Sequence, residues 1–107
     1  MSVFMTMEAA GDPKAMEQYA ADNKEKMQTV LAAAKRHGLI AHRFHGSDDG
    51  TKLLVVDEWP DRQSFEAFFQ EMQSELGPMF AAARVTAQIA PTFWRELSTH
   101  DAYGWGV

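Results

Sequence analysis

The 107-residue chain contains no cysteine. It therefore has no disulfide framework, no thiolate nucleophile and no cysteine-bound zinc or iron–sulfur cluster. Positive charge is also scarce, because 10 Lys and Arg stand against 15 Asp and Glu and give a net charge of −5. Neutralising nucleic-acid phosphates requires clustered Lys and Arg, so we expect no nucleic-acid partner.

Long apolar runs are missing as well. None approaches the roughly 20 residues that a membrane-spanning helix requires, so we expect no membrane partner. The opening segment, MSVFMTMEAAGD, lacks the basic start and the long apolar stretch of a secretion signal. We therefore expect a cytoplasmic protein.

Hydrophobic residues are abundant for so short a chain. They make up 46% of the sequence, and aromatic residues make up 11%. A chain of this length is expected to form one domain, residues 1–107. Such a domain buries only about two-thirds of the surface that the unfolded chain exposes. The excess of apolar residues suggests self-association, with the aromatic tail at residues 98–107 packing on a partner subunit.

Two helices are predicted. Asp12-Pro13 opens the first helix, which continues to the basic residues before Gly38. Pro60-Asp61 opens the second, and Gly77-Pro78 is expected to end it, with a further short helical turn at residues 79–84. The apolar stripe of the second helix consists of Phe65, Phe68, Phe69, Met72 and Leu76.

Four strands flank these helices. They are expected at residues 3–8, 39–45, 51–59 and 87–97. Turn-forming residues separate the second strand from the third, and Pro91 restricts the last strand to a sheet edge or a bulge. The order β-α-β-β-α-β predicts an α+β, ferredoxin-like fold, in which an antiparallel sheet carries both helices on one face.

The third strand is apolar on both of its faces. Leu53, Leu54, Val55 and Val56 are consecutive, so side chains on each side of the sheet avoid water. Two helices can cover only one side. A second copy of the chain is the simplest cover for the other side, which predicts a homodimer.

The hairpin of the second and third strands sorts its side chains into two sets. One face is expected to carry Ile40, His42, Phe44, Leu53, Val55, Asp57 and Trp59, and the other Ala41, Arg43, His45, Leu54, Val56 and Glu58. His42 and Asp57 are the only titratable groups of the first face. A histidine beside a carboxylate can act as a base, although a hydrogen-bonded, inert histidine at the rim is the alternative. His42 and His45 point to opposite faces and cannot share one metal, so no metal site is expected.

The stretch from Gly38 to Phe65 resembles a known family. A glycine before the strand, an Asp49-Gly50-Thr51 turn, an apolar strand ending in Glu58-Trp59 and an aromatic residue six positions later are similar to antibiotic biosynthesis monooxygenase-like domains. These belong to the dimeric α+β barrel superfamily. The resemblance implies a homodimer with a pocket between sheet and helices, and cofactor-independent oxygenation of polycyclic aromatic quinols.

Individual residues match this family only in part. Trp59 is retained, but Val55 stands where quinol-oxidising members have Asn, and Phe65 stands where they have Tyr. Neither side chain here can form a hydrogen bond. An arginine farther along the chain assists in that branch, and Arg84 lies near that position in this sequence. The haem-degrading branch is excluded, since Phe68 and Pro78 occupy the region of its Trp and His, and residues 2–8 contain no Asn.

Together these observations predict a homodimer that binds a small apolar or aromatic molecule without a cofactor. His42 would act as base and Asp57 would orient it. The substrate would contact Trp59, Phe65, Phe69 and Val55, although the aromatic residues of this set could serve mainly as core. The alternatives are a non-catalytic ligand-binding or interaction homodimer, and an isomerase- or cyclase-like enzyme that uses the same histidine without oxygen.

Other polar and aromatic residues are interpreted structurally. His100-Asp101 in the tail is a chance adjacency rather than a metal or relay fragment. Trp94, Tyr103 and Trp105 are expected to anchor the last strand and the tail across the partner subunit. Polar pairs across the dimer interface are expected from Arg43, His45 and Glu58.

Overall fold

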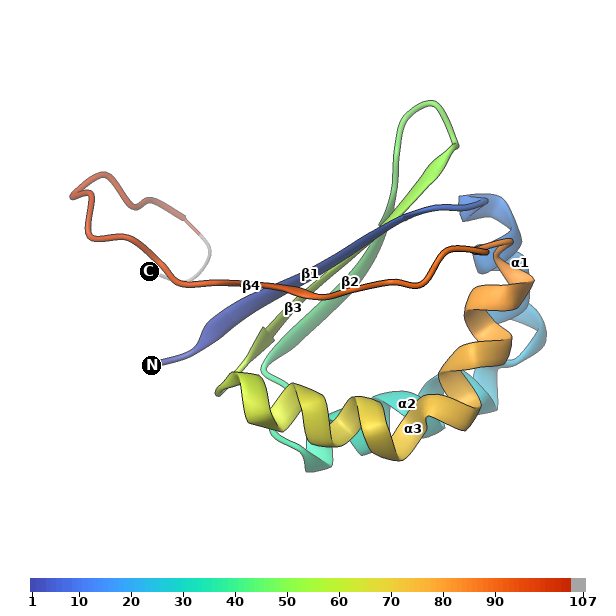
Figure 1. Ribbon diagram of the computed structural model, residues 1–107, viewed down its shortest axis with the longest axis horizontal. Helices are drawn as coiled ribbons and strands as arrows, with labels where there is room; N and C mark the ends of the chain where they lie inside the picture. The colour runs from blue at the N-terminus through green and yellow to red at the C-terminus, as the bar shows by residue number, and fades with distance from the viewer. Residues whose placement is uncertain (105–107) are drawn as a thin grey trace.

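A computed structural model describes residues 1–104 of the chain. Its elements are β1 (Val3–Ala10), α1 (Pro13–Asp22), α2 (Lys24–Arg36), β2 (Ala41–Gly46), β3 (Lys52–Trp59), α3 (Arg62–Ala82) and β4 (Thr92–Trp94). The four strands form one antiparallel sheet in the order β2-β3-β1-β4. The helices lie along one face of that sheet (Figure 1). The predicted ferredoxin-like fold is confirmed.

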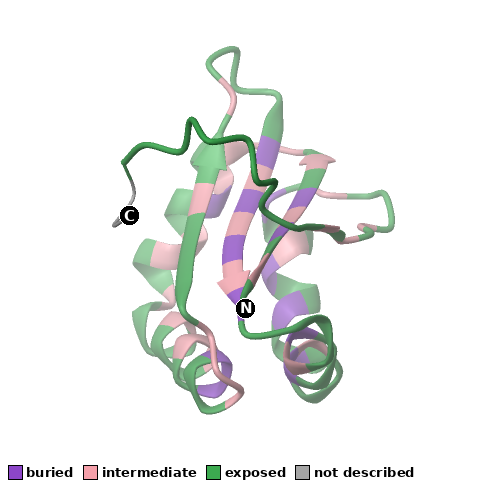
Figure 2. Ribbon diagram, turned by 90° about the vertical axis from the view of Figure 1, so that its left-hand side faces the viewer, coloured by how far each residue is buried: buried purple, intermediate pink, exposed green. Residues whose placement is uncertain are grey.

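The core lies between the sheet and the helices. Along β3, buried and half-buried residues alternate, as expected for a strand with one face against helices (Figure 2). Trp59 and Met5 are fully buried at the centre of this layer. The helices contribute the remaining large side chains, chiefly Phe65, Phe68, Met72, Leu76 and Met79 of α3.

The first predicted helix is divided in the structure. A break at Asn23, which has φ −134° and ψ 45°, separates α1 from α2. The Asn23 side chain donates to the carbonyl of Tyr19 at 2.9 Å, and its backbone N–H donates to Ala20. Hydrogen bonds from an asparagine side chain compete with those of the helix, and here they interrupt it. The apolar stripe in the sequence continues on both sides of this break and therefore does not reveal it.

The prediction that Gly77-Pro78 ends the second helix is wrong. α3 continues through both residues to Ala82 and takes in the separate turn expected at residues 79–84. It changes direction in its C-terminal part, drawn in orange in Figure 1, as a helix does around an internal proline. Beyond the proline, Met79 and Ala83 are 2% and 0% exposed. Their burial offsets the lost backbone hydrogen bond.

The last strand is much shorter than the predicted residues 87–97. β4 pairs only through Thr92, Phe93 and Trp94, at the edge of the sheet beside β1. Pro91 precedes it and has no N–H to donate. Because β4 is antiparallel to β1, the chain after Trp94 runs past the start of β1 at Val3 and has no strand to pair with.

No helix among residues 1–104 covers the second face of the sheet, called here the open face. Leu54 and Val56 are half-buried there, whereas Phe4 and Trp94 are 46% and 54% exposed. Phe4 and Trp94 are cross-strand neighbours, so their side chains form one apolar patch. No helix in this part of the chain is long and apolar enough to cross a membrane.

Candidate functional site

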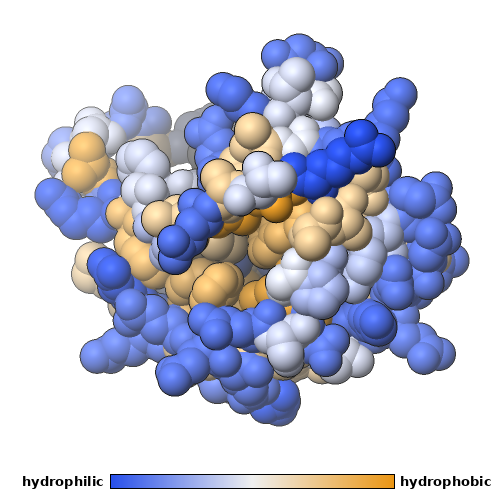
Figure 3. Space-filling view, turned by 45° about the vertical axis from the view of Figure 1, so that its right-hand side comes forward, coloured by the Kyte–Doolittle hydropathy of each residue, from blue (hydrophilic) through white to orange (hydrophobic). Residues whose placement is uncertain are grey.

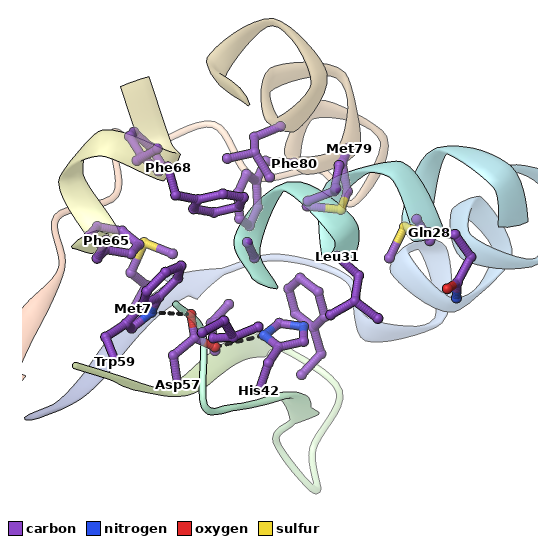
Figure 4. Close-up of a pocket in the computed structure, with 18 residues that line it drawn as sticks. Met7, Gln28, Leu31, His42, Asp57, Trp59, Phe65, Phe68, Met79 and Phe80 are labelled. Carbon is purple, nitrogen blue, oxygen red and sulfur yellow. Dashed lines mark hydrogen bonds and ion pairs between the residues drawn. The ribbon is translucent and has the colours of Figure 1, made fainter. Parts of the chain in front are cut away.

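A cavity of about 210 Å³ lies between the sheet and helices α2 and α3, and is called here the main cavity. Hydrophobic side chains gather around a hollow on the side of the molecule shown in Figure 3, with hydrophilic side chains around them. The walls of the main cavity are apolar except for Gln28, His42 and Asp57 (Figure 4). Cavities of this kind, with few polar groups in an apolar lining, are typical binding sites for small molecules.

The pairing of β2 with β3 brings the two titratable residues together. His42 lies directly opposite Asp57 in the register, and Trp59 follows Asp57 by two residues on the same face. His42 Nδ1 lies 2.6 Å from Asp57 Oδ1, and Trp59 Nε1 donates to Asp57 Oδ2 at 3.1 Å. We call this arrangement the Trp59–Asp57–His42 network.

Asp57 is 5% exposed and is the one buried polar residue within residues 1–104. A buried carboxylate is costly unless its oxygens accept hydrogen bonds, and both oxygens do so here. An ionised carboxylate accepts only, so Nδ1 of a neutral His42 must carry the hydrogen. The lone pair of that imidazole is then on Nε2, which has no hydrogen-bond partner among the described residues. This arrangement leaves His42 equipped to accept a proton.

Aromatic side chains form the wall beside this network. Phe65 meets Trp59 edge to face, with centroids 5.7 Å apart, and Phe68 is tilted against Trp59 at 5.4 Å. Phe69 stacks on Phe65 at 5.5 Å. The six predicted site residues therefore line one cavity: His42, Asp57, Trp59, Phe65, Phe69 and Val55.

Several lining residues were not identified from the sequence as parts of the site. Gln28 of α2 lies at one end of the cavity in Figure 4, one helical turn before Leu31. Its place beside the apolar stripe of the helix was a usable signal. Met79 and Phe80 were missed for another reason, because the helix was expected to end at the proline before them.

Two carboxylates hold the helices that form the wall. Asp61 caps α3 by accepting from the Ser64 backbone N–H at 2.8 Å, and this hydrogen bond lowers the pKa of its carboxyl group. Glu71 of α3 accepts from His37 and from Arg36 at the end of α2, each at 3.0 Å. These bonds, that from His37 first, lower the pKa of Glu71. The spacing of α2 and α3 is thus tied to an ionised Glu71.

Other residues considered from the sequence lie away from the cavity. Arg84 follows α3 with φ 63° and approaches Asp12 at 4.0 Å. His45 points to the open face, and His100-Asp101 lies in the exposed tail. Among residues 1–104, no three His, Asp or Glu side chains are clustered as metal ligands. Trp105 lies outside the described residues.

The fold and the cavity define a ferredoxin-like α+β domain with an apolar cavity between its sheet and its helices. Solved structures of an antibiotic biosynthesis monooxygenase and of a dimeric ferredoxin-like protein have the same fold. One solved antibiotic biosynthesis monooxygenase superposes with a TM-score of 0.62 and 10% identity, over 89% of this chain and 98% of that chain. The resemblance seen in the sequence is confirmed at the level of fold.

Two further solved structures have the same fold. A monooxygenase from ActVA-Orf6 of Streptomyces coelicolor, in complex with Nanaomycin D, has a TM-score of 0.60 and 14% identity, over 92% of this chain and 88% of that chain. A dimeric ferredoxin-like protein from an uncultured marine organism has a TM-score of 0.59 and 15% identity, over 86% and 91% of the two chains. No protein-family model and no curated protein sequence matches this chain.

Proposed function

We propose that this protein is a cofactor-independent monooxygenase that binds a small, largely apolar aromatic molecule in the main cavity. The observation that carries the proposal is the Trp59–Asp57–His42 network in an otherwise apolar wall. The shared fold with a monooxygenase that binds Nanaomycin D supports an aromatic substrate. The expected substrate is a quinol- or anthrone-like compound with an acidic C–H or O–H group.

The reaction begins with proton transfer to Nε2 of His42. The positive charge that develops on the imidazole is stabilised by Asp57, which is already hydrogen-bonded to Nδ1. Asp57 is in turn held by Trp59. The substrate becomes a delocalised carbanion, and Val55, Phe65 and the other apolar lining residues exclude water from it.

Molecular oxygen is the second substrate. The carbanion transfers one electron to O₂, and the two radicals combine to form a C–O bond. The resulting peroxide takes the proton back from His42, and loss of water then breaks the O–O bond and leaves a carbonyl group. The balance is R₂CH₂ + O₂ → R₂C=O + H₂O, so no external reductant is consumed.

Oxygen uptake with a panel of anthrones and quinols tests this function. The wild type is expected to consume one O₂ per substrate, and His42→Ala to lose ~10²–10⁴-fold in rate, the contribution of a positioned base. His100→Ala serves as the control, because His100 lies in the exposed tail away from the cavity. No uptake by the wild type, or equal uptake by His42→Ala, would refute the mechanism.

A non-catalytic ligand-binding homodimer is the second candidate. It is favoured by the apolar side chains of Val55 and Phe65, which cannot form hydrogen bonds with a substrate. The hydrogen-bonding groups of the lining are then Gln28, the Trp59 indole and the pair His42–Asp57. Thermal stabilisation by anthrones without oxygen uptake would indicate this function. Exchange of the acidic substrate hydrogen for deuterium without oxygen uptake would instead indicate an isomerase- or cyclase-like enzyme.

The open face is proposed as the homodimer interface. Phe4 and Trp94 expose a joined apolar patch there, and Leu54 and Val56 extend it. Covering such surface contributes about 2.5 kcal/mol per 100 Å² of apolar area. Residues 95–104 extend away from the domain in Figure 1, where they could pack on the partner. A dimeric ferredoxin-like protein with the same fold supports this assembly.

Sedimentation equilibrium tests the interface. The wild type is expected to be dimeric at micromolar concentration, and Phe4→Glu to weaken the dimer by ~100-fold or more, because it buries an unpaired carboxylate. Circular dichroism would verify that the variant is folded. A well-folded, ligand-free wild-type monomer at that concentration would refute the dimer.

A further inference from the structure

A second cavity, of about 330 Å³, lies between the C-terminal half of α3, the segment after it and β1. Met7, Phe69, Leu76 and Phe80 line both this cavity and the main cavity. The two cavities therefore lie back to back, and the wall between them consists of these four side chains. A ligand that passes this wall would occupy both cavities.

The wall contains two side chains that can move more easily than the others. Phe69 and Phe80 are half-buried, whereas Met7 and Leu76 are each 7% exposed. Rotating a half-buried ring breaks fewer packing contacts than displacing a buried side chain. Gly77 adds space on the far side, because a Cβ atom built there would meet nothing within 4 Å.

The two cavities differ in the polar groups that they offer. The main cavity holds the His42–Asp57 pair, whereas the second cavity has no charged residue in its lining and two amides, Gln73 and Gln88. Both glutamines are exposed, and neither amide has a hydrogen-bond partner within residues 1–104. Amides can both donate and accept hydrogen bonds, but they cannot neutralise a charge.

We infer that the second cavity is a subsite for the far end of the same ligand, and that it selects an uncharged hydrogen-bonding group such as a hydroxyl or an amide. The ligand is then an elongated molecule with an acidic ring at His42 and a neutral polar arm near Gln73 and Gln88. A charged arm gains no counter-charge from this lining, which contains no charged residue. This inference rests on the proposed function, which places the reactive ring in the main cavity.

Equilibrium binding of three probes tests the subsite. The probes are anthrone, anthrone with a neutral hydroxyalkyl arm on an outer ring, and anthrone with a carboxyalkyl arm of equal length at the same position. The hydroxyl arm is expected to lower Kd by ~3- to 10-fold, the value of one hydrogen bond, and the carboxylate arm to lower it by less, because it meets no counter-charge.

Variants then assign the effect to the second cavity. The double variant Gln73→Leu/Gln88→Leu keeps the side-chain volume and is expected to remove the preference for the hydroxyl arm. Ala87→Phe fills the cavity with a ring and should make the armed probe bind more weakly than anthrone. Gln70→Leu is the matched control, because Gln70 is exposed on α3 and lines neither cavity.

The two proposals fail in different ways. If anthrone binds and the arm changes nothing, or if Gln70→Leu and the double variant lose the preference equally, the subsite is refuted while the proposed function stands. If neither anthrone nor its armed forms bind the wild type, both are refuted.

Discussion

Asp57→Asn changes which nitrogen of His42 carries the hydrogen. Trp59 Nε1 only donates, so the amide oxygen of Asn must face the indole and the amide NH₂ must face His42. Nδ1 then accepts from this NH₂, and the hydrogen of the neutral imidazole moves to Nε2. The variant keeps the shape of the wild type but has no lone pair on Nε2 to take a proton from the substrate.

The cost in stability follows from the two hydrogen bonds of Asp57. In the variant, the neutral amide of Asn replaces an ionised carboxylate in each bond. A hydrogen bond to a charged group contributes about 1 kcal/mol more to stability than one between neutral groups. The His42 side chain is 32% exposed, so its bond is partly compensated by water. The free energy of unfolding is expected to fall by about 1–2 kcal/mol, which leaves a typical domain folded. Oxygen uptake is expected to fall by ~10²–10⁴-fold.

Nitrogen-15 NMR of His42 measures the tautomer without any substrate. The wild type is expected to show the hydrogen of the neutral ring on Nδ1, and Asp57→Asn to show it on Nε2. Glu58→Gln is the matched control, since Glu58 is the next residue of β3 and faces the other side of the sheet. An Asp57→Asn protein that retains the hydrogen on Nδ1, or that switches tautomer and oxidises anthrones at the wild-type rate, would refute the reasoning.

Three further predictions concern stability. Because the pKa of Glu71 is lowered from 4.5 in the folded state, its bonds from His37 and Arg36 stabilise the fold above that pH and are lost as the pH falls through the lowered value. Glu71→Gln should therefore be less stable than the wild type at pH 7, and urea titrations should show this difference shrinking as the pH falls below 4.5. Gly77→Ala should change the free energy of unfolding by less than about 1 kcal/mol, because the helix propensity of alanine is opposed by the restriction that Pro78 places on a preceding residue with a Cβ atom. Gly38→Ala should lower it by about 1–2 kcal/mol, because Gly38 has φ +99° and the new Cβ would lie 2.9 Å from the Pro60 ring; equal midpoints for the two glycine variants would contradict this pair of expectations.

Much of the fold could be predicted from short-range patterns. The hairpin of β2 and β3 is set by a turn and by a two-residue periodicity, so the side chains that share a face follow directly from the sequence. That periodicity alone predicts His42, Asp57 and Trp59 on one face, as the register shows. The four apolar residues from Leu53 to Val56 likewise identified a strand with two apolar faces, of which the helices cover one.

Two of the three errors occurred where tertiary contacts outweigh local preference. Gly77-Pro78 is a strong local signal for the end of a helix, yet burial of Met79 and Ala83 favours its continuation. At Asn23, one side-chain hydrogen bond interrupts a helix whose apolar stripe is intact. The length of β4 depends on where β1 begins. The starting residue of β1 cannot be inferred from residues 87–97 alone. The end of α3 and the length of β4 thus depend on contacts with other elements, whereas the break at Asn23 depends on a local hydrogen bond to Tyr19.

The register of one hairpin links the site to the core. Phe44 lies opposite Val55, and the pairing that brings these two together also sets His42 against Asp57 two positions further along. A slip of one residue would turn His42 away from the helices and leave Asp57 buried with one oxygen unsatisfied, at a cost of about 1–3 kcal/mol beyond the lost packing. The buried carboxylate therefore favours the correct register as well as orienting the base. Its pairing with His42 should persist in any variant that keeps the hairpin, whereas access of a substrate to Nε2 depends on α2 and α3.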